Sequence, residues 1–134
     1  MSESRPAIGL VVAHGTMAEG LVDAVRRIAG GAADALTPVS NEGLTPQDLR
    51  DELKRLADGG PVVVFADLQS GSCGMAAFAC CRGERDRAVL CGVNLPVLLD
   101  FVFHRDLPFD ELIPRLVSKG RESVLQLQPS RASG

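Results

Sequence analysis

The feature that most constrains this sequence is an uninterrupted apolar run near its start, AIGLVVA at residues 7–13, which ends at His14. Because no polar residue interrupts the run, both of its faces must be covered, as in a strand of a parallel sheet. A helical pattern of apolar residues begins at Met17. His14 is therefore expected in a tight turn at the carboxyl end of a strand, where open α/β sheets bind their ligands.

A second stretch repeats this arrangement in the middle of the chain. The run VVVFA at residues 62–66 is followed by Asp67, by the small-residue loop 68–74 and by a helical stretch over 75–81. Since parallel strands present their carboxyl ends at the same edge of a sheet, neighbouring strands would bring His14 and Asp67 together.

The rest of the chain alternates between strand and helix patterns. Apart from the elements above, the pattern predicts helices over residues 17–30, 45–57, 97–103 and 110–117, and strands over 35–39, 88–93 and 123–128. Pro114 is expected to shorten or kink the last helix. The order predicts an α/β fold: a doubly wound, mostly parallel sheet with helices on both faces and an antiparallel C-terminal edge strand. We expect one domain over residues 1–128 and a disordered tail over 129–134.

Composition excludes several functional classes. The net charge of −3, the absence of any basic run and the lack of Trp and Tyr argue against a nucleic-acid partner. No apolar run is long enough to span a membrane and no signal pattern opens the chain, so a soluble cytoplasmic protein is expected. The four cysteines form no C-x-x-C pair and have no histidine at metal-ligand spacing, which predicts small buried hydrophobes and no metal site.

His14 and Asp67 together suggest phosphoryl chemistry. A carboxylate that accepts a hydrogen bond from one ring nitrogen sets the tautomer and leaves the other nitrogen free to attack phosphorus. Backbone N–H groups and hydroxyls of four flanking residues are candidates to stabilise the phosphoryl oxygens: Gly15, Thr16, Gly71 and Ser72. The alternative is purely structural, with His14 in a turn, Asp67 as a helix cap and the glycines as turn formers. The pairing of two strand ends favours the functional interpretation.

Four segments together resemble one known family. They are VVAHGT at residues 11–16, FADLQSGS at 65–72, CGVNLPVL at 91–98 and GRESV at 120–124. In this order and spacing they resemble the IIA domain of the mannose-type sugar phosphotransferase system, over about residues 7–128.

The resemblance implies a phosphocarrier that needs no cofactor. His14 would accept a phosphoryl group from the histidine-containing phosphocarrier protein and pass it to a IIB partner. Asp67 matches the acidic residue that pairs with this histidine, and Ser72 matches the serine or threonine of the phosphate loop. Members of the family commonly dimerise by exchanging a C-terminal edge strand, for which residues 124–127 are the candidate here.

The loop after Asp67 departs from the usual pattern of that family, Asp-x-x-Gly-Gly-Ser/Thr-Pro. Ser70 stands where the first glycine is usual, and Cys73 stands where the proline is usual. A cysteine beside a helix start can have a lowered thiol pKa and react with oxidants. The alternative is an inert, partly buried thiol.

Two further functions stay open from the sequence. One is a regulatory module that signals through phosphorylation-dependent partner binding. The other is a phosphocarrier of a dihydroxyacetone kinase, which has a related fold, although the GVNLP segment at residues 92–96 and the loop after Asp67 favour the mannose-type branch.

Overall fold

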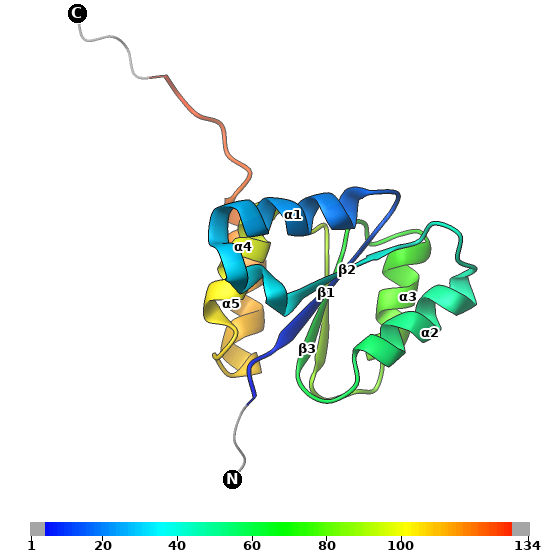
Figure 1. Ribbon diagram of the computed structural model, residues 1–134. Helices are drawn as coiled ribbons and strands as arrows, with labels where there is room; N and C mark the ends of the chain where they lie inside the picture. The colour runs from blue at the N-terminus through cyan, green and yellow to red at the C-terminus, as the bar shows by residue number, and fades with distance from the viewer. Residues whose placement is uncertain (1–4, 130–134) are drawn as a thin grey trace, which may run out of the picture.

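A four-stranded, all-parallel sheet lies at the centre of the protein (Figure 1). The structure is a computed structural model that describes residues 5–129. The strands are β1 (Ile8–Ala13), β2 (Leu36–Ser40), β3 (Val62–Ala66) and β4 (Arg87–Cys91), in the spatial order β2-β1-β3-β4. In register, Val12 of β1 lies between Val39 of β2 and Ala66 of β3. The carboxyl ends of β1 and β3 are therefore neighbours, as the sequence predicts.

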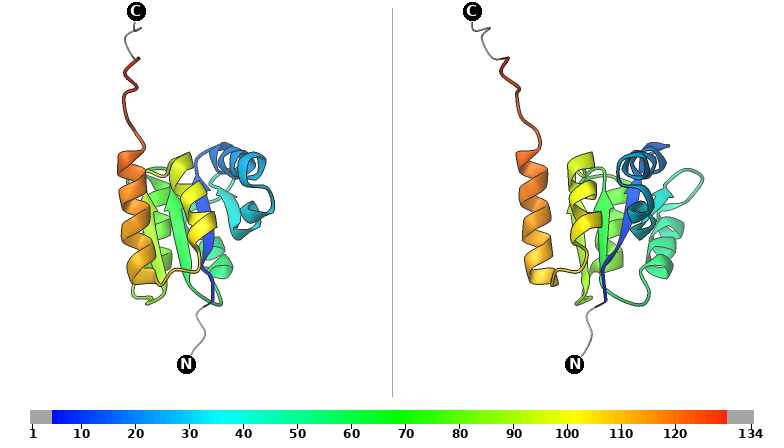
Figure 2. Two further views of the ribbon diagram at one scale, coloured as in Figure 1. Left: turned by 90° about the vertical axis from the view of Figure 1, so that its left-hand side faces the viewer. Right: turned by 60° about the vertical axis from the view of Figure 1, so that its left-hand side comes forward.

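Helices cover both faces of this sheet (Figures 1 and 2). On one face lie α1 (Met17–Ala29), the 3-10 helix η1 (Gly30–Ala35), α4 (Leu95–His104) and α5 (Phe109–Glu122). On the other lie α2 (Pro46–Leu56) and α3 (Ser72–Cys81). The expected doubly wound α/β fold is confirmed, although η1 was not predicted.

The two cores follow from the alternation of side chains along the strands. In β3, Val63 and Phe65 point toward α1, α4 and α5, whereas Val62 and Val64 point toward α2 and α3. The Phe65 ring packs edge-on against Phe101 of α4, with ring centroids 5.2 Å apart. Both faces of the central strands are thus buried, which is why those strands have continuous apolar sequences.

Local signals placed α2 correctly, but the expected shortening of α5 by Pro114 is wrong. Thr45 and Asp48 form a reciprocal capping box at the start of α2, with Pro46 in the first turn. Pro114 does not shorten α5, which continues to Glu122. Burial of Leu112 and Leu116 on both sides of the proline holds the helix against the core and outweighs the one backbone hydrogen bond that proline cannot make.

The predicted C-terminal edge strand over residues 123–128 is also wrong. Ser123 ends α5, and residues 124–129 form no strand. Every strand found in residues 5–129 runs parallel to its neighbours, so an antiparallel member is lacking there. Val124, Leu125 and Leu127 are all exposed, so the segment buries neither face. Alternation alone does not supply a neighbouring strand to pair with.

The predicted disordered tail begins at residue 129, which has no regular structure, and its remainder, residues 130–134, lies outside the described residues. Within residues 5–129, no helix has both the length and the apolar character required to cross a membrane.

Candidate functional site

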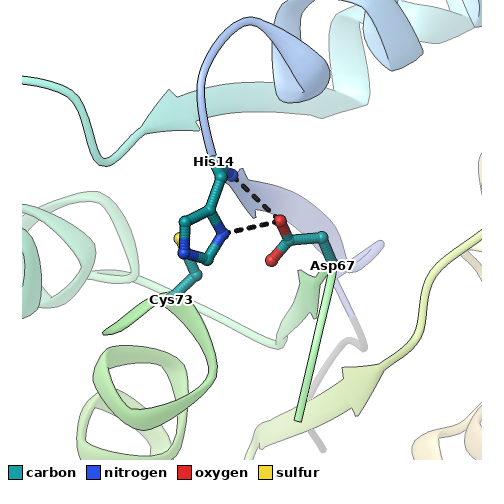
Figure 3. A group of neighbouring side chains, drawn as sticks. All are labelled: His14, Asp67 and Cys73. Carbon is teal, nitrogen blue, oxygen red and sulfur yellow. Dashed lines mark hydrogen bonds and ion pairs between the residues drawn. The ribbon is translucent and has the colours of Figure 1, made fainter. Parts of the chain in front are cut away.

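The site lies where the chain reverses its direction of winding across the sheet. From β1 the chain passes over one face through α1 to β2, and from β2 it returns over the opposite face through α2 to β3. The helices that follow β1 and β3 therefore leave on opposite sides and open a crevice at the carboxyl ends of these strands. His14 follows β1 and Asp67 follows β3, so both lie at this crevice (Figure 3).

Two hydrogen bonds tie His14 to Asp67. The imidazole Nδ1 lies 2.8 Å from Asp67 Oδ2, and the backbone N–H of His14 donates to the same oxygen at 2.9 Å. The other carboxylate oxygen, Oδ1, accepts from the backbone N–H of Leu68 at 2.9 Å. The Asp67 side chain is 8% exposed and the His14 side chain 45% exposed. The carboxylate is thus held rigidly, while one edge of the imidazole faces solvent.

The environment of Asp67 favours its ionised form. Partial burial raises the pKa of the Asp67 carboxyl, but the hydrogen bonds and charge of His14, together with the Leu68 N–H, more than offset this and lower the pKa below its usual value. An ionised carboxylate only accepts hydrogen bonds, so Nδ1 of His14 carries the proton that is shared with Asp67. The lone pair of His14 is then on Nε2, away from Asp67.

The start of α3 lies beside this ring nitrogen. Gly71 precedes the helix with φ of +95°, and a Cβ atom at this position would lie 3.8 Å from His14 Nε2. No side chain caps the helix, and the N–H groups of its first turn, residues 72–74, have no acceptor inside the helix. A helix N-terminus attracts anions through such N–H groups and its dipole. The structure therefore brings Gly71 next to His14, and Ser72 follows it as the first residue of α3.

Close packing holds the loop of residues 68–71 against α3. A Cβ atom at Gly74 would lie 2.3 Å from the carbonyl oxygen of Gln69 and 2.5 Å from that of Leu68, so only glycine fits. Ser70 causes no backbone strain, because all residues with positive φ in the described part of the chain are glycines. The serine at this position is therefore compatible with the loop conformation.

Gly15 is held by two residues that the sequence did not point to. Its N–H donates to Asn41 Oδ1 at 3.2 Å, and its carbonyl accepts from Ser40 Oγ at 2.8 Å. Both residues come from the end of β2 and the loop after it, a segment whose strand pattern is weak. A role for the Gly15 N–H in phosphoryl binding stays a prediction, and it would require this group to leave Asn41. Thr16 is exposed at the start of α1, where its side chain makes no capping hydrogen bond.

Cys73 lies under the imidazole, in the first turn of α3 (Figure 3). Its side chain is fully buried. Burial and the charge of Asp67 raise the pKa of the Cys73 thiol to about 11, against a smaller opposing effect of Ser72. The hypothesis of a lowered pKa is therefore wrong, because a helix start does not compensate for burial beside a carboxylate.

An open groove of about 1120 Å³ adjoins the site. The loop at Gly71 and Ser72 forms one side of it, and the start of α2 forms another. Two large apolar side chains of α3, Met75 and Phe78, line it while 70% and 61% exposed. Arg50 and Arg82 also line it, so the groove combines apolar side chains with positive charge.

Comparison with solved structures shows the same fold. An EIIA component of the phosphotransferase system from Streptococcus agalactiae superposes with a TM-score of 0.82 at 24% identity, over 90% of this chain and 96% of that one. The mannose/sorbose-specific IIA subunit from Enterococcus faecalis superposes with a TM-score of 0.81 at 23% identity, over 92% of this chain and 96% of that one. No curated protein matches the sequence significantly.

The family assignment rests on the sequence match. The family model described as the fructose IIA component of the phosphotransferase system matches residues 9–114, a segment that includes both His14 and Asp67. The chain therefore belongs to the family of IIA components of the sugar phosphotransferase system, which are phosphotransferase relay proteins.

Proposed function

We propose that this protein is a phosphocarrier that accepts a phosphoryl group on His14 from the histidine-containing phosphocarrier protein and passes it to a IIB partner. The observation that carries the proposal is the hydrogen bond of 2.8 Å between His14 Nδ1 and Asp67, which leaves Nε2 free at the half-exposed edge of the ring. The phosphocarrier unit would comprise residues 1–128 and would work in the cytoplasm, without a cofactor.

The proposed step is an in-line displacement at phosphorus. The lone pair of His14 Nε2 forms a bond to phosphorus while the P–N bond of the donor's phosphohistidine breaks and its electron pair returns to the donor ring. Nδ1 keeps its proton, so the His14 ring becomes cationic. The ionised Asp67 carboxylate stabilises this charge through its hydrogen bond to Nδ1. Transfer to the acceptor reverses the same bond changes.

The residues around Nε2 suit a phosphoryl group. Its oxygens would face the first turn of α3, with the hydroxyl and N–H of Ser72 and the close backbone approach that Gly71 permits. The exposed Thr16 hydroxyl would lie on the other side, beside Gly15. This support should remain moderate, because a phosphoryl group that is bound too tightly would not be transferred onward.

Partner proteins must reach the exposed edge of the ring. The groove beside it offers Met75 and Phe78 as apolar contacts and Arg50 and Arg82 as positive charges. We expect the donor to contact this surface, because it is the hollow that borders the loop at Gly71.

We also expect the protein to form a homodimer. β4 is an edge strand whose side chains are only partly buried, and β3 is its sole neighbour within residues 5–129. The exposed apolar residues Val124, Leu125 and Leu127 are further surface that contact with a second copy would cover. Sedimentation equilibrium tests this, with Leu125→Asp expected to shift the protein toward the monomer. A wild-type monomer at micromolar concentration would contradict it.

Phosphorylation on His14 is tested with enzyme I, the histidine-containing phosphocarrier protein and phosphoenolpyruvate, read by intact mass. The wild type should gain one acid-labile phosphoryl group, and His14→Ala should gain none. The matched control is His104→Ala, since His104 is the chain's other histidine and lies at the end of α4. Phosphorylation that survives in His14→Ala or disappears in His104→Ala would contradict the assignment.

Onward transfer is tested by adding a IIB protein to the isolated phosphoprotein. Movement of the phosphoryl group to IIB supports the relay. A stable phosphoprotein that only changes its binding partners would instead favour the regulatory alternative.

A further inference from the structure

We propose that His14, Asp67 and Cys73 form a binding site for Zn²⁺, and that the bound metal blocks phosphoryl acceptance. The metal site follows from the arrangement of these side chains alone. The effect on phosphorylation rests on the proposed function.

The three residues bring three different donor atoms to one place. A ring nitrogen of His14, a carboxylate oxygen of Asp67 and the sulfur of Cys73 all lie within 4.8 Å of one another. They come from three segments: the turn after β1, the end of β3 and the first turn of α3 (Figure 3). Packing of these elements fixes the backbone of each donor residue independently, and the side chains close from this spacing onto the metal as the hydrogen bond between His14 Nδ1 and Asp67 is replaced.

The donor set selects the kind of metal. Nitrogen, oxygen and sulfur ligands suit Zn²⁺, whereas Mg²⁺ and Ca²⁺ require sites built of oxygen ligands. Three protein ligands leave the fourth tetrahedral position for water. On binding, the Cys73 thiol loses its proton to solvent and a Zn–S bond forms. His14 binds through Nδ1, the ring nitrogen beside Asp67, which loses its proton to solvent while Nε2 takes one up. Asp67 donates an existing lone pair. No electron is transferred.

Burial and hydrogen bonding support the site. Cys73 is fully buried and Asp67 is 8% exposed, which shields the ligands, while the 45% exposed His14 side chain leaves an entry path. The Asp67 carboxylate is oriented by the backbone N–H groups of His14 and Leu68, at 2.9 Å each. Such outer hydrogen bonds hold metal ligands in position.

Metal and phosphoryl group compete for the same imidazole. With Zn²⁺ on Nδ1, the ring proton lies on Nε2, which then has no lone pair to attack phosphorus. The Asp67 carboxylate, bound to the metal, no longer orients the His14 ring. The site would therefore make phosphorylation sensitive to free Zn²⁺.

Metal binding is tested on the metal-free protein with Co²⁺ as a spectroscopic probe and with Zn²⁺ in competition with a chromophoric chelator. The wild type should bind one ion per chain and show a thiolate-to-Co²⁺ charge-transfer band. Cys73→Ser should lose the band and bind Zn²⁺ at least ~100-fold more weakly, the upper end of the cost of losing an outer-shell partner. Cys80→Ser is the matched control, because Cys80 is also a buried thiol of α3 but lies outside the cluster and the groove, and it should bind the metal as wild type does.

X-ray absorption at the zinc edge tests the unmodified protein directly. One sulfur at about 2.3 Å and two or three nitrogen or oxygen neighbours at about 2.0–2.2 Å are expected. Absence of a sulfur neighbour in the wild type would overturn the site, and this result does not depend on whether any variant folds. A Co²⁺ charge-transfer band that persists in folded Cys73→Ser would also overturn it.

The consequence is tested by phosphorylating each protein with and without Zn²⁺, after confirming that the donor proteins tolerate the metal. Zn²⁺ should suppress phosphorylation of wild type and of Cys80→Ser. In Cys73→Ser, the rate with Zn²⁺ should stay close to the rate without it. If metal binds but the metal-free protein is never phosphorylated, the proposed function fails and the site stands. If the protein is phosphorylated but binds no Zn²⁺, the site fails alone.

Discussion

The helices α3 and α4 have the same length of ten residues and are both largely apolar, yet they have opposite roles in the structure. Asn94 caps α4 by accepting a hydrogen bond from the Val97 N–H, whereas no side chain caps α3. On its outer side, α4 is packed by α5 and tied to it by Asp100. The outer side of α3 exposes Met75 and Phe78.

This difference separates stability from function. At the N-terminus of α4, Asn94 accepts from the Val97 N–H and Pro96 has no N–H, so this helix end has fewer free N–H groups to offer a ligand. The N-terminus of α3 keeps its N–H groups beside His14, and its outer face borders the groove. We therefore expect substitutions in α4 to lower stability, and those in and around α3 to alter phosphoryl transfer.

Phe101→Ala should have the largest effect. The ring is fully buried in α4 and packs against Phe65, so its loss should lower the free energy of unfolding by about 3–5 kcal/mol. Chemical denaturation measures this change. At temperatures where the variant is folded, its phosphorylation rate should remain near that of wild type. A variant with wild-type stability but slow phosphorylation would contradict the assignment of α4 to stability and α3 to phosphoryl transfer.

Asp67→Asn should slow phosphorylation of His14 by roughly a hundredfold or more, the range for a lost general acid–base partner. An amide still fills the space but no longer stabilises the cationic ring. Initial rates of phosphoryl transfer from the donor protein measure the effect. Transfer at the wild-type rate would show that the hydrogen bond to His14 Nδ1 has no orienting role.

Asn94→Ala should have a moderate effect confined to stability. It removes the cap of α4 and the hydrogen bond from Asn94 Nδ2 to the Gly120 carbonyl, for an expected loss of about 1–2 kcal/mol. Thermal or urea unfolding gives the value. If Asn94 acts only as a cap, the rate of phosphorylation should be unchanged. A slower rate in Asn94→Ala would show that α4 also affects the site.

Phe78→Ala should change stability least, within about 0.5 kcal/mol, because the side chain is already 61% exposed. It should nevertheless weaken binding of the donor protein about fivefold to tenfold, as expected for loss of one apolar contact worth about 1 kcal/mol. Steady-state KM for the donor measures this. Phe103→Ala is the matched control, because Phe103 of α4 is 62% exposed but lies outside the groove, and an equal rise in KM would refute the assigned surface.

Local pattern was sufficient for most of the fold. The apolar runs that became β1 and β3 are buried on both faces, and the capping signals at Thr45 and Pro46 marked the start of α2. Such signals depend only on residues close in sequence, so they predict an element correctly without knowledge of what packs against it. Pro114 and the alternating residues 124–127 misled because their effect depends on what packs beside them.

The sequence by itself determined that His14 and Asp67 would lie at the same edge of the sheet, since each follows a buried strand and parallel strands share an edge. The tertiary structure decided that these two strands are neighbours and what surrounds the pair. Asn41 holds Gly15 across 26 positions of sequence, and Cys73 lies beneath an imidazole from the opposite side of the crevice. These contacts depend on strand order and on the close packing of α3 at Gly74, and neither is encoded in a pattern of neighbouring residues.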